Sequence, residues 1–253
     1  MWKRIAAPKP FTVLGTLGEA QKLIKGSKWA LLAPLLAFIA ASGALTYIFS
    51  LIFDAMNITD ASPHRTWAIA YSLASFFLFL VACLFVCALC GVFKVAIRRA
   101  RTHHIVPIHV GFHAFSRFVP AAITVLFISF LLILPVIFIV LHLFIFVFYA
   151  FVIGVFFCLS LPLVVDKTNF PLLAMTQSAK ATSRYFLKIS GIFVILIALF
   201  FIAYLPLGLG LYFHSKVISI IGGGILFLAM LWLIPLKYLT VSVIYKKLIT
   251  HSL

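Results

Sequence analysis

A run of 48 almost uninterrupted apolar residues, from Phe118 to Val165, constrains the fold more than any other stretch of this sequence. As one α-helix it would be about 72 Å long, more than twice the hydrocarbon core of a bilayer, which is about 30 Å thick. The chain must therefore reverse inside the run. His142, near the midpoint, is the only histidine or charged residue in it. The sequence predicts spans over 118–140 and 143–165, a tight turn at His142 and a kink at Pro135. The alternative for His142 is a buried proton relay.

Four further apolar runs are long enough to cross a bilayer: 29–53, 67–93, 189–213 and 217–236. The composition agrees, because 65% of the residues are hydrophobic and 9% are charged, against roughly 45–50% and about 25% in soluble domains. The small residues at 40–44 resemble a signal-peptide cleavage zone, but apolar sequence continues to Phe53, which favours a span. Three glycines at 222–224 predict close helix packing or a local bend. The sequence therefore predicts an all-α polytopic membrane protein, one integral domain over 1–253 with six transmembrane helices.

The positive charges lie in alternate connecting segments. Of the 20 Lys and Arg residues, 18 fall within 1–28, 94–117, 166–188 and 237–253, whereas Arg65 and Lys216 lie in the other loops. Short loops rich in Lys and Arg stay in the cytoplasm, so we expect three hairpins with both termini inside, in a multi-pass protein of the bacterial inner membrane. A net charge of +16 suggests nucleic acid in a soluble protein. Here the bases border apolar spans, so we expect anionic membrane lipids, and no nucleic acid, as partners.

One tripeptide pattern opens each predicted hairpin. Ser27-Lys28-Trp29, Ser116-Arg117-Phe118 and Ser183-Arg184-Tyr185 each read serine, base, aromatic. A base at this position can bind headgroup phosphate while the ring lies at the interface. The pattern favours a threefold repeat over 12–93, 105–165 and 170–245, in which a cytoplasmic interfacial amphipathic helix precedes two spans. The alternative is coincidence, because any anchored start of a span favours these residue types.

The segment 166–188 has the clearest amphipathic pattern in the chain. On one helix, an apolar face is formed by Leu172, Met175, Ala179 and Phe186, and the opposite face by Gln177, Lys180, Arg184 and Lys188. Pro171 fits the first turn of such a helix, which is suited to the headgroup region. Five bases are the expected contacts with lipid phosphate: Lys28, Arg117, Lys180, Arg184 and Lys188. The alternative is that these bases only set the topology.

Two groups of potential metal ligands lack the residues that would complete a site. Four histidines lie in 94–117: His103, His104, His109 and His113. The last two are spaced as ligands on one helix face can be, but no carboxylate or cysteine of the segment joins them. Cys83, Cys87 and Cys90 share a helix face in an apolar run, without the polar partners that support metal ligands. We expect no metal and no cofactor, with metal binding or pH sensing by the histidines as the alternative.

A short motif follows a proline-containing span end and precedes another long span: Asp166, Pro171, Ala174, Ser178 and Lys180. In this the chain resembles bacterial six-helix inner-membrane proteins that are similar to the membrane domain of glycerophosphoryl diester phosphodiesterases. The resemblance covers roughly 150–245, and the first half only by topology, with Asp166, Pro171 and Ser178 as a boundary motif. That family's residues have no agreed catalytic role. Its separate acidic, metal-binding catalytic domain has no counterpart here, so the resemblance implies a fold and no activity.

The acids are too few and too scattered for a catalytic arrangement. Glu19 and Asp166 are predicted inside, Asp54 and Asp60 outside, and none lies within a span, whereas a metal-dependent hydrolase needs several ligands on one side. We expect no catalytic residues. The prediction is a non-enzymatic membrane protein whose basic cytoplasmic collar engages anionic lipid, and which organises the envelope or binds a membrane protein or a second copy of itself. The alternative is a transporter of a lipid or small solute, although ion-coupled carriers place charged groups at mid-membrane.

Overall fold

The structure is a computed structural model that describes residues 11–55, 63–112, 117–133, 143–167 and 170–249. Every regular element in these ranges is helical, so the all-α prediction is confirmed for them. The helices are α1 (Val13–Ile24), α2 (Lys28–Ala55), α3 (Pro63–Thr102), α4 (His109–Phe112), α5 (Phe118–Ile133), α6 (Leu143–Phe157), α7 (Ser160–Asp166), α8 (Pro171–Ser183), α9 (Phe186–Tyr212) and α10 (Lys216–Ile249).

Five stretches of described helix are long and apolar enough to cross a membrane. They are Lys28–Ile52, Ala74–Thr102, Val147–Asp166, Phe186–Tyr212 and Lys216–Ile249. The described part of the remaining predicted span, 118–140, is a shorter apolar helix, Phe118–Leu132. The predicted turn at His142 and kink at Pro135 lie outside the described residues. The membrane-protein prediction is therefore supported by five helices, and the sixth span stays a prediction.

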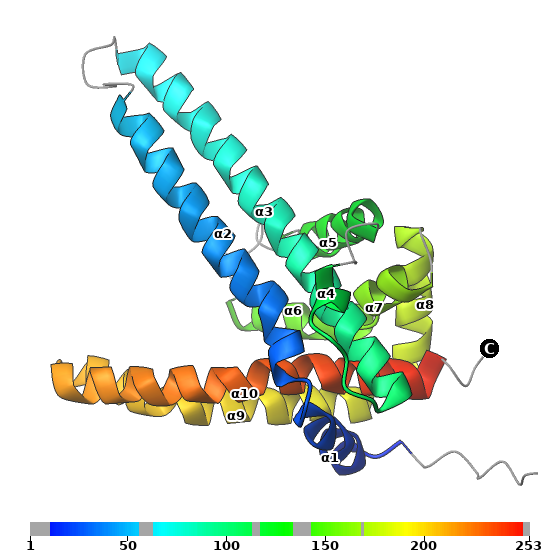
Figure 1. Ribbon diagram of the computed structural model, residues 1–253. Helices are drawn as coiled ribbons and strands as arrows, with labels where there is room; N and C mark the ends of the chain where they lie inside the picture. Colours follow the sequence, from blue (N-terminus) through cyan, green and yellow to red (C-terminus); the bar gives the residue numbers. More distant parts are fainter. Residues whose placement is uncertain (1–10, 56–62, 113–116, 134–142, 168–169, 250–253) are drawn as a thin grey trace, which may run out of the picture.

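Two pairs of long helices give the molecule its shape (Figure 1). α2 lies beside α3, and α9 lies beside α10. The two pairs meet at one end and diverge toward their far ends, while α1, α7 and α8 lie around the shared end (Figure 1). We call this shared end the packed base; it consists of the C-terminal parts of α3 and α10, the N-terminal parts of α2, α5 and α9, and α1, α7 and α8 with the described residues that connect them.

The buried core is concentrated at the packed base. The largest fully buried side chains are Tyr245, Leu31, Leu159, Leu163, Ile189, Ile192, Leu239, Ile244, Val92, Val95, Val155 and Val164. The far parts of the two pairs instead expose large apolar side chains, among them Tyr47, Phe79, Phe201 and Phe227. Apolar surface of this extent is unfavourable in water. The far parts therefore match predicted membrane spans, whereas the base is held together by its own core.

Two helices continue past the predicted ends of their spans. α3 runs on from Phe93 to Thr102, and α10 runs on from Leu236 to Ile249. The prediction ended each span at the first lysine, because charge marks where a chain leaves the hydrocarbon. A helix itself continues as long as its backbone hydrogen bonds and a packed face support it. Lys94 and Lys237 therefore lie inside continuous helices.

The start of α9 corrects the predicted single helix over 171–188. α8 ends at Ser183, and Arg184 and Tyr185 form a turn before α9 begins at Phe186. Phe186 and Lys188 therefore belong to a different helix from the residues with which the pattern grouped them. The sequence holds no glycine or proline at this point that would signal the break. Pro171 does occupy the first turn of α8, as predicted.

Helices precede the long pairs at two of the three predicted places. α1 comes before α2 and α3, and α8 comes before α9 and α10. In the middle unit, the described part of 105–117 holds only the short α4. α1 packs on α10 and α9, and α8 packs on α6 and α7 (Figure 1). Both helices are thus part of the packed base, and the threefold repeat stays a prediction.

α9 and α10 approach each other closely at two glycines. A Cβ atom at Gly222 would lie 2.5 Å from the backbone nitrogen of Leu207, and one at Gly210 would lie 2.5 Å from the backbone nitrogen of Ser219. A Cβ at Gly223 would meet no other described part of the chain within 4 Å. Of the glycines at 222–224, Gly222 is therefore the one that allows close packing.

Candidate functional site

Three residues far apart in the sequence join α3, α7 and α10 at the packed base. Arg101 Nη1 donates to Asp166 Oδ1 over 2.8 Å, and Nη2 donates to Oδ2 over 2.5 Å, which makes the ion pair bidentate. The hydroxyl of Tyr245 donates to Asp166 Oδ2. Tyr245 is fully buried, and the Asp166 side chain is 13% exposed. Both carboxylate oxygens of Asp166 therefore have partners within the chain. We call these residues the Arg101–Asp166–Tyr245 cluster.

A second set of contacts fastens α1 to the base. Arg99, which is buried, donates from Nε to the carbonyl oxygen of Leu23 over 3.2 Å and from Nη2 to that of Lys25 over 2.7 Å. Carbonyl groups at the end of a helix lack partners within it, so Arg99 caps the end of α1. Lys247 Nζ lies 2.9 Å from Glu19 Oε2 on the same helix. α1 is thus held by both α3 and α10.

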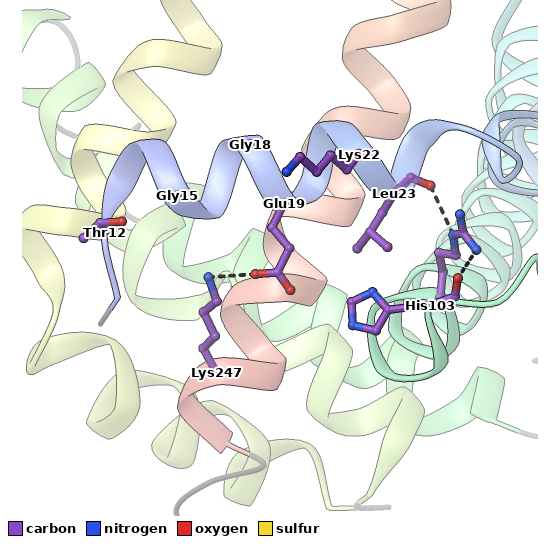
Figure 2. A pocket seen from close by; sticks show the side chains of 9 residues that line it. Thr12, Gly15, Gly18, Glu19, Lys22, Leu23, His103 and Lys247 are labelled. Carbon is purple, nitrogen blue, oxygen red and sulfur yellow. Dashed lines mark hydrogen bonds and ion pairs between the residues drawn. The ribbon is translucent and has the colours of Figure 1, made fainter. Parts of the chain in front are cut away.

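A hollow of about 840 Å³ lies where α1 meets α3 and α10 (Figure 2). The Glu19–Lys247 ion pair spans it, and His103, just after α3, lines the opposite side (Figure 2). Arg99 of α3 also belongs to its lining. Glu19 offsets the charge of Lys247, and Arg99 is engaged by backbone carbonyls. Most of the charged side chains that line this hollow therefore attach α1 to α3 and α10.

Two hydroxyl groups of α8 support the break between α6 and α7. Ser178 donates to the carbonyl oxygen of Phe156 over 2.7 Å and accepts from the N–H of Leu159 over 3.2 Å. Thr182 donates to the same Phe156 oxygen over 3.1 Å. These backbone groups lie at helix ends, where partners within the helix are missing. The predicted span 143–165, of which Val147–Asp166 is long and apolar enough to cross a membrane, therefore contains a turn between α6 and α7, and Ser178 has a packing role there.

The residues predicted as phosphate contacts are spread over the packed base rather than gathered in one site. Lys180, Arg184 and Lys188 are exposed around the turn between α8 and α9, whereas Lys28 begins α2 and Arg117 lies just before α5. The charged groups of Lys28 and Arg184 each lie 5.9 Å from the ring of the next residue in the chain. This base–aromatic contact is the geometry expected of an interfacial anchor.

Arg117 lines a second hollow together with three bases that the prediction did not select. This hollow of about 550 Å³ lies between α3, α4, the start of α5 and the end of α7. Its bases from α3 are Lys94, Arg98 and Arg101, and Asp166 is the only acid among its described lining residues. We call these five residues the basic hollow. The sequence signal was the spacing of four and then three residues, which places Lys94, Arg98 and Arg101 on one helix face. It was missed because the sequence analysis ended the span at Phe93 and assigned 94–117 to a connecting segment.

The histidines and cysteines do not gather into a metal site in the described part of the chain. No group of three or more His, Cys, Asp or Glu residues lies close enough there to hold an ion. His103 directly follows α3 with a φ of 57°, and its Nε2 lies 2.9 Å from Lys246 Nζ. His113 lies outside the described residues. His103 thus contributes to the junction of α3 with α10.

No protein-family model, curated protein or solved structure matches the chain. The class of protein is defined by the chain itself: in its described residues it is an all-helical protein with five helices long and apolar enough to cross a membrane. The resemblance to the membrane domain of glycerophosphoryl diester phosphodiesterases stays a prediction.

Proposed function

We propose that the protein is a non-enzymatic, multi-pass component of the bacterial inner membrane whose packed base faces the cytoplasm and binds anionic lipid headgroups. One observation carries this proposal. Basic side chains surround the packed base, whereas the far parts of the helix pairs expose large apolar side chains. Segments rich in Lys and Arg stay on the cytoplasmic side, and anionic lipids attract bases beside a membrane, so both preferences favour the same orientation.

In the proposed topology, six spans form three hairpins with both termini in the cytoplasm. The pairs α2–α3 and α9–α10 supply two hairpins, and α5 with α6 and α7 supplies the third. A contact between α5 and α6 supports a reversal of the chain between them, because the hydroxyl of Tyr149 donates to the carbonyl oxygen of Leu131 over 3.2 Å. At the far end of the α9–α10 pair, a short turn before Lys216 joins the two helices.

The turn between α8 and α9 has the surface chemistry of a headgroup contact. Leu172 is 60% exposed and Leu187 is 83% exposed, and they lie near Lys180, Arg184 and Lys188 in the chain. Leucine side chains can enter the acyl boundary while neighbouring bases meet phosphate groups. A lipid-bound base of this kind suits a component that organises the envelope, or that binds a membrane-protein partner or a second copy of itself.

Replacing Lys180 and Arg184 together by glutamine tests this proposal. Each base beside a membrane contributes about 1 kcal/mol to its attraction for anionic lipid. Because 1.4 kcal/mol is a factor of ten in affinity, the double variant should bind phosphatidylglycerol roughly 10- to 30-fold more weakly. The measurement is competition for a fluorescent anionic lipid by the purified protein in nanodiscs.

Lys216→Gln is the matched control, because Lys216 is exposed at the far end of α10. It should leave lipid binding unchanged. Equal binding of phosphatidylglycerol and phosphatidylcholine by the unaltered protein, or an equal loss in the Lys216 variant, would contradict the proposal. Solute uptake by vesicles reconstituted with the protein would instead favour a transporter.

A further inference from the structure

An open apolar groove runs along the α9–α10 pair. It has a volume of about 440 Å³ and is lined by one face of each helix, from Phe193 to Phe200 in α9 and from Met230 to Lys237 in α10. On both helices the lining residues follow the spacing i, i+3, i+4, i+7, which is one continuous face. The two helices are antiparallel, because a short turn joins them. Phe193 and Lys237 therefore lie at the same end of the groove, and Phe200 and Met230 lie at the other.

The groove combines buried and exposed apolar side chains. Leu196 and Leu233 of its lining are buried, whereas Ile197 and Phe200 are exposed. Exposed apolar side chains favour acyl chains over water as their surroundings. The open side of the groove is therefore suited to admit an acyl chain laterally from a bilayer.

Lys237 is the only ionisable residue in the described lining of the groove. Its side chain is exposed, and its Nζ lies 5.6 Å from the ring centroid of the neighbouring Tyr238. Glu19 and Asp166 each have a basic partner elsewhere on the packed base, so neither neutralises Lys237. A positive charge beside apolar side chains favours an anion whose remainder is apolar.

The place of Lys237 along α10 matches the headgroup level of a membrane. The predicted apolar span 217–236 ends next to it, and the groove extends from there toward the far end of the pair. Each lining face extends over about 10 Å of helix axis, which accommodates part of one acyl chain. In the proposed topology, a headgroup at Lys237 belongs to the cytoplasmic leaflet.

We propose that this groove binds one anionic phospholipid, with its phosphate at Lys237 and one acyl chain along the groove. A phospholipid supplies the charge and the apolar part in one molecule, and its second chain can stay in the bilayer because the groove is open on one side. The site differs from the bases around the α8–α9 turn because it recognises the chain as well as the headgroup. For the leaflet that supplies the lipid, this inference rests on the proposed function.

A second copy of this chain fits the groove less well than a phospholipid. Of its described acids, Glu19 and Asp166 are already paired, and Asp54 belongs to the far end of α2. A helix of the second copy would therefore cover Lys237 without supplying a negative charge, and burying an unpaired charge is costly.

Native mass spectrometry of the purified full-length protein in detergent tests the inference. Titration with dioleoyl-phosphatidylglycerol or dioleoyl-phosphatidylcholine counts the lipids bound and gives the affinity for the first of them, which should be higher for phosphatidylglycerol. Lys237→Gln should weaken the binding of phosphatidylglycerol roughly fivefold, because it removes one base at the headgroup level, and Lys237→Arg should restore it. Ile197→Trp places a larger side chain in the groove without changing any charge, and it should weaken the binding of both lipids.

Val194→Trp is the matched control for Ile197→Trp, because Val194 is an exposed residue of α9 outside the described lining of the groove. It should leave both affinities unchanged. Unchanged affinity for phosphatidylglycerol in either Lys237→Gln or Ile197→Trp, or equal losses with tryptophan at 194 and at 197, would overturn the inference while the proposed function stands. A dimer that Ile197→Trp dissociates would overturn it in favour of a second copy.

Failure of the proposed function would give a different pattern in the same titration. Lys180→Gln with Arg184→Gln would then leave the binding of anionic lipid unchanged, while Lys237→Gln and Ile197→Trp would still weaken it. That result would support the groove site on its own.

Discussion

Replacing Gly222 by alanine should lower the apparent melting temperature of the detergent-solubilised protein by roughly 5 °C or more. The new Cβ atom would lie 2.5 Å from the backbone nitrogen of Leu207 and 2.6 Å from its Cα atom. Backbone atoms cannot turn aside as the end of a flexible side chain can, so α9 and α10 would have to separate. Overpacking of this kind costs about 1–3 kcal/mol. Tryptophan fluorescence during a thermal ramp measures the effect.

Gly223→Ala is the control for this prediction. A Cβ atom there meets no other described part of the chain within 4 Å, and alanine is favoured over glycine in a helix interior by about 1 kcal/mol. The Gly223 variant should therefore melt at or above the temperature of the unaltered protein. Equal melting temperatures for the two variants would mean that α9 and α10 do not pack at Gly222 as the structure describes.

Asp166→Asn should be the second strongly destabilising change, with a loss of about 2–3 kcal/mol in the free energy of unfolding. Removing one member of a buried ion pair costs about 3–5 kcal/mol, and the cost is lower here because the Arg101 side chain is 36% exposed. Asparagine is uncharged and has a single side-chain oxygen as acceptor. It therefore cannot accept both hydrogen bonds from Arg101, and it lacks the charge that strengthens the hydrogen bond from the hydroxyl of Tyr245. The same thermal ramp in detergent measures the loss.

A double-mutant cycle separates this ion pair from general damage at the base. Arg101→Gln combined with Asp166→Asn should cost less than the sum of the two single changes, since the second change removes a group that has already lost its partner. Additive losses, or a melting temperature of Asp166→Asn within about 1 °C of the unaltered protein, would show that the cluster does not hold α3, α7 and α10 together.

Local patterns were enough to predict the long apolar helices, and non-local contacts were not predictable from them. The helices follow from runs of apolar residues, which are properties of neighbouring positions. The Arg101–Asp166–Tyr245 cluster joins residues 65 and 79 positions apart. The local sequence does not indicate that these positions are in contact, because the distance between them depends on how whole helices pack.

The basic residues of the candidate site illustrate the same limit of prediction from local sequence patterns. Exposed residues such as Lys180 and Arg184 were found from their helical periodicity. The basic hollow was not found, because it needs α3 to continue beyond Lys94 and Arg117 to return beside it. A charged residue at the end of an apolar run was interpreted as the end of a helix, when it marks only the end of the apolar surface.

In the proposed topology, the packed base and the far ends of the helix pairs lie on opposite sides of a membrane. Labelling of single cysteines tests it most directly, at Ser183→Cys in the base and Lys216→Cys at the far end, both exposed positions, with the four native cysteines replaced by alanine. A membrane-impermeant maleimide added to spheroplasts should label position 216 and spare position 183, and inverted vesicles should give the reverse. Labelling of both positions from the same side would contradict the account.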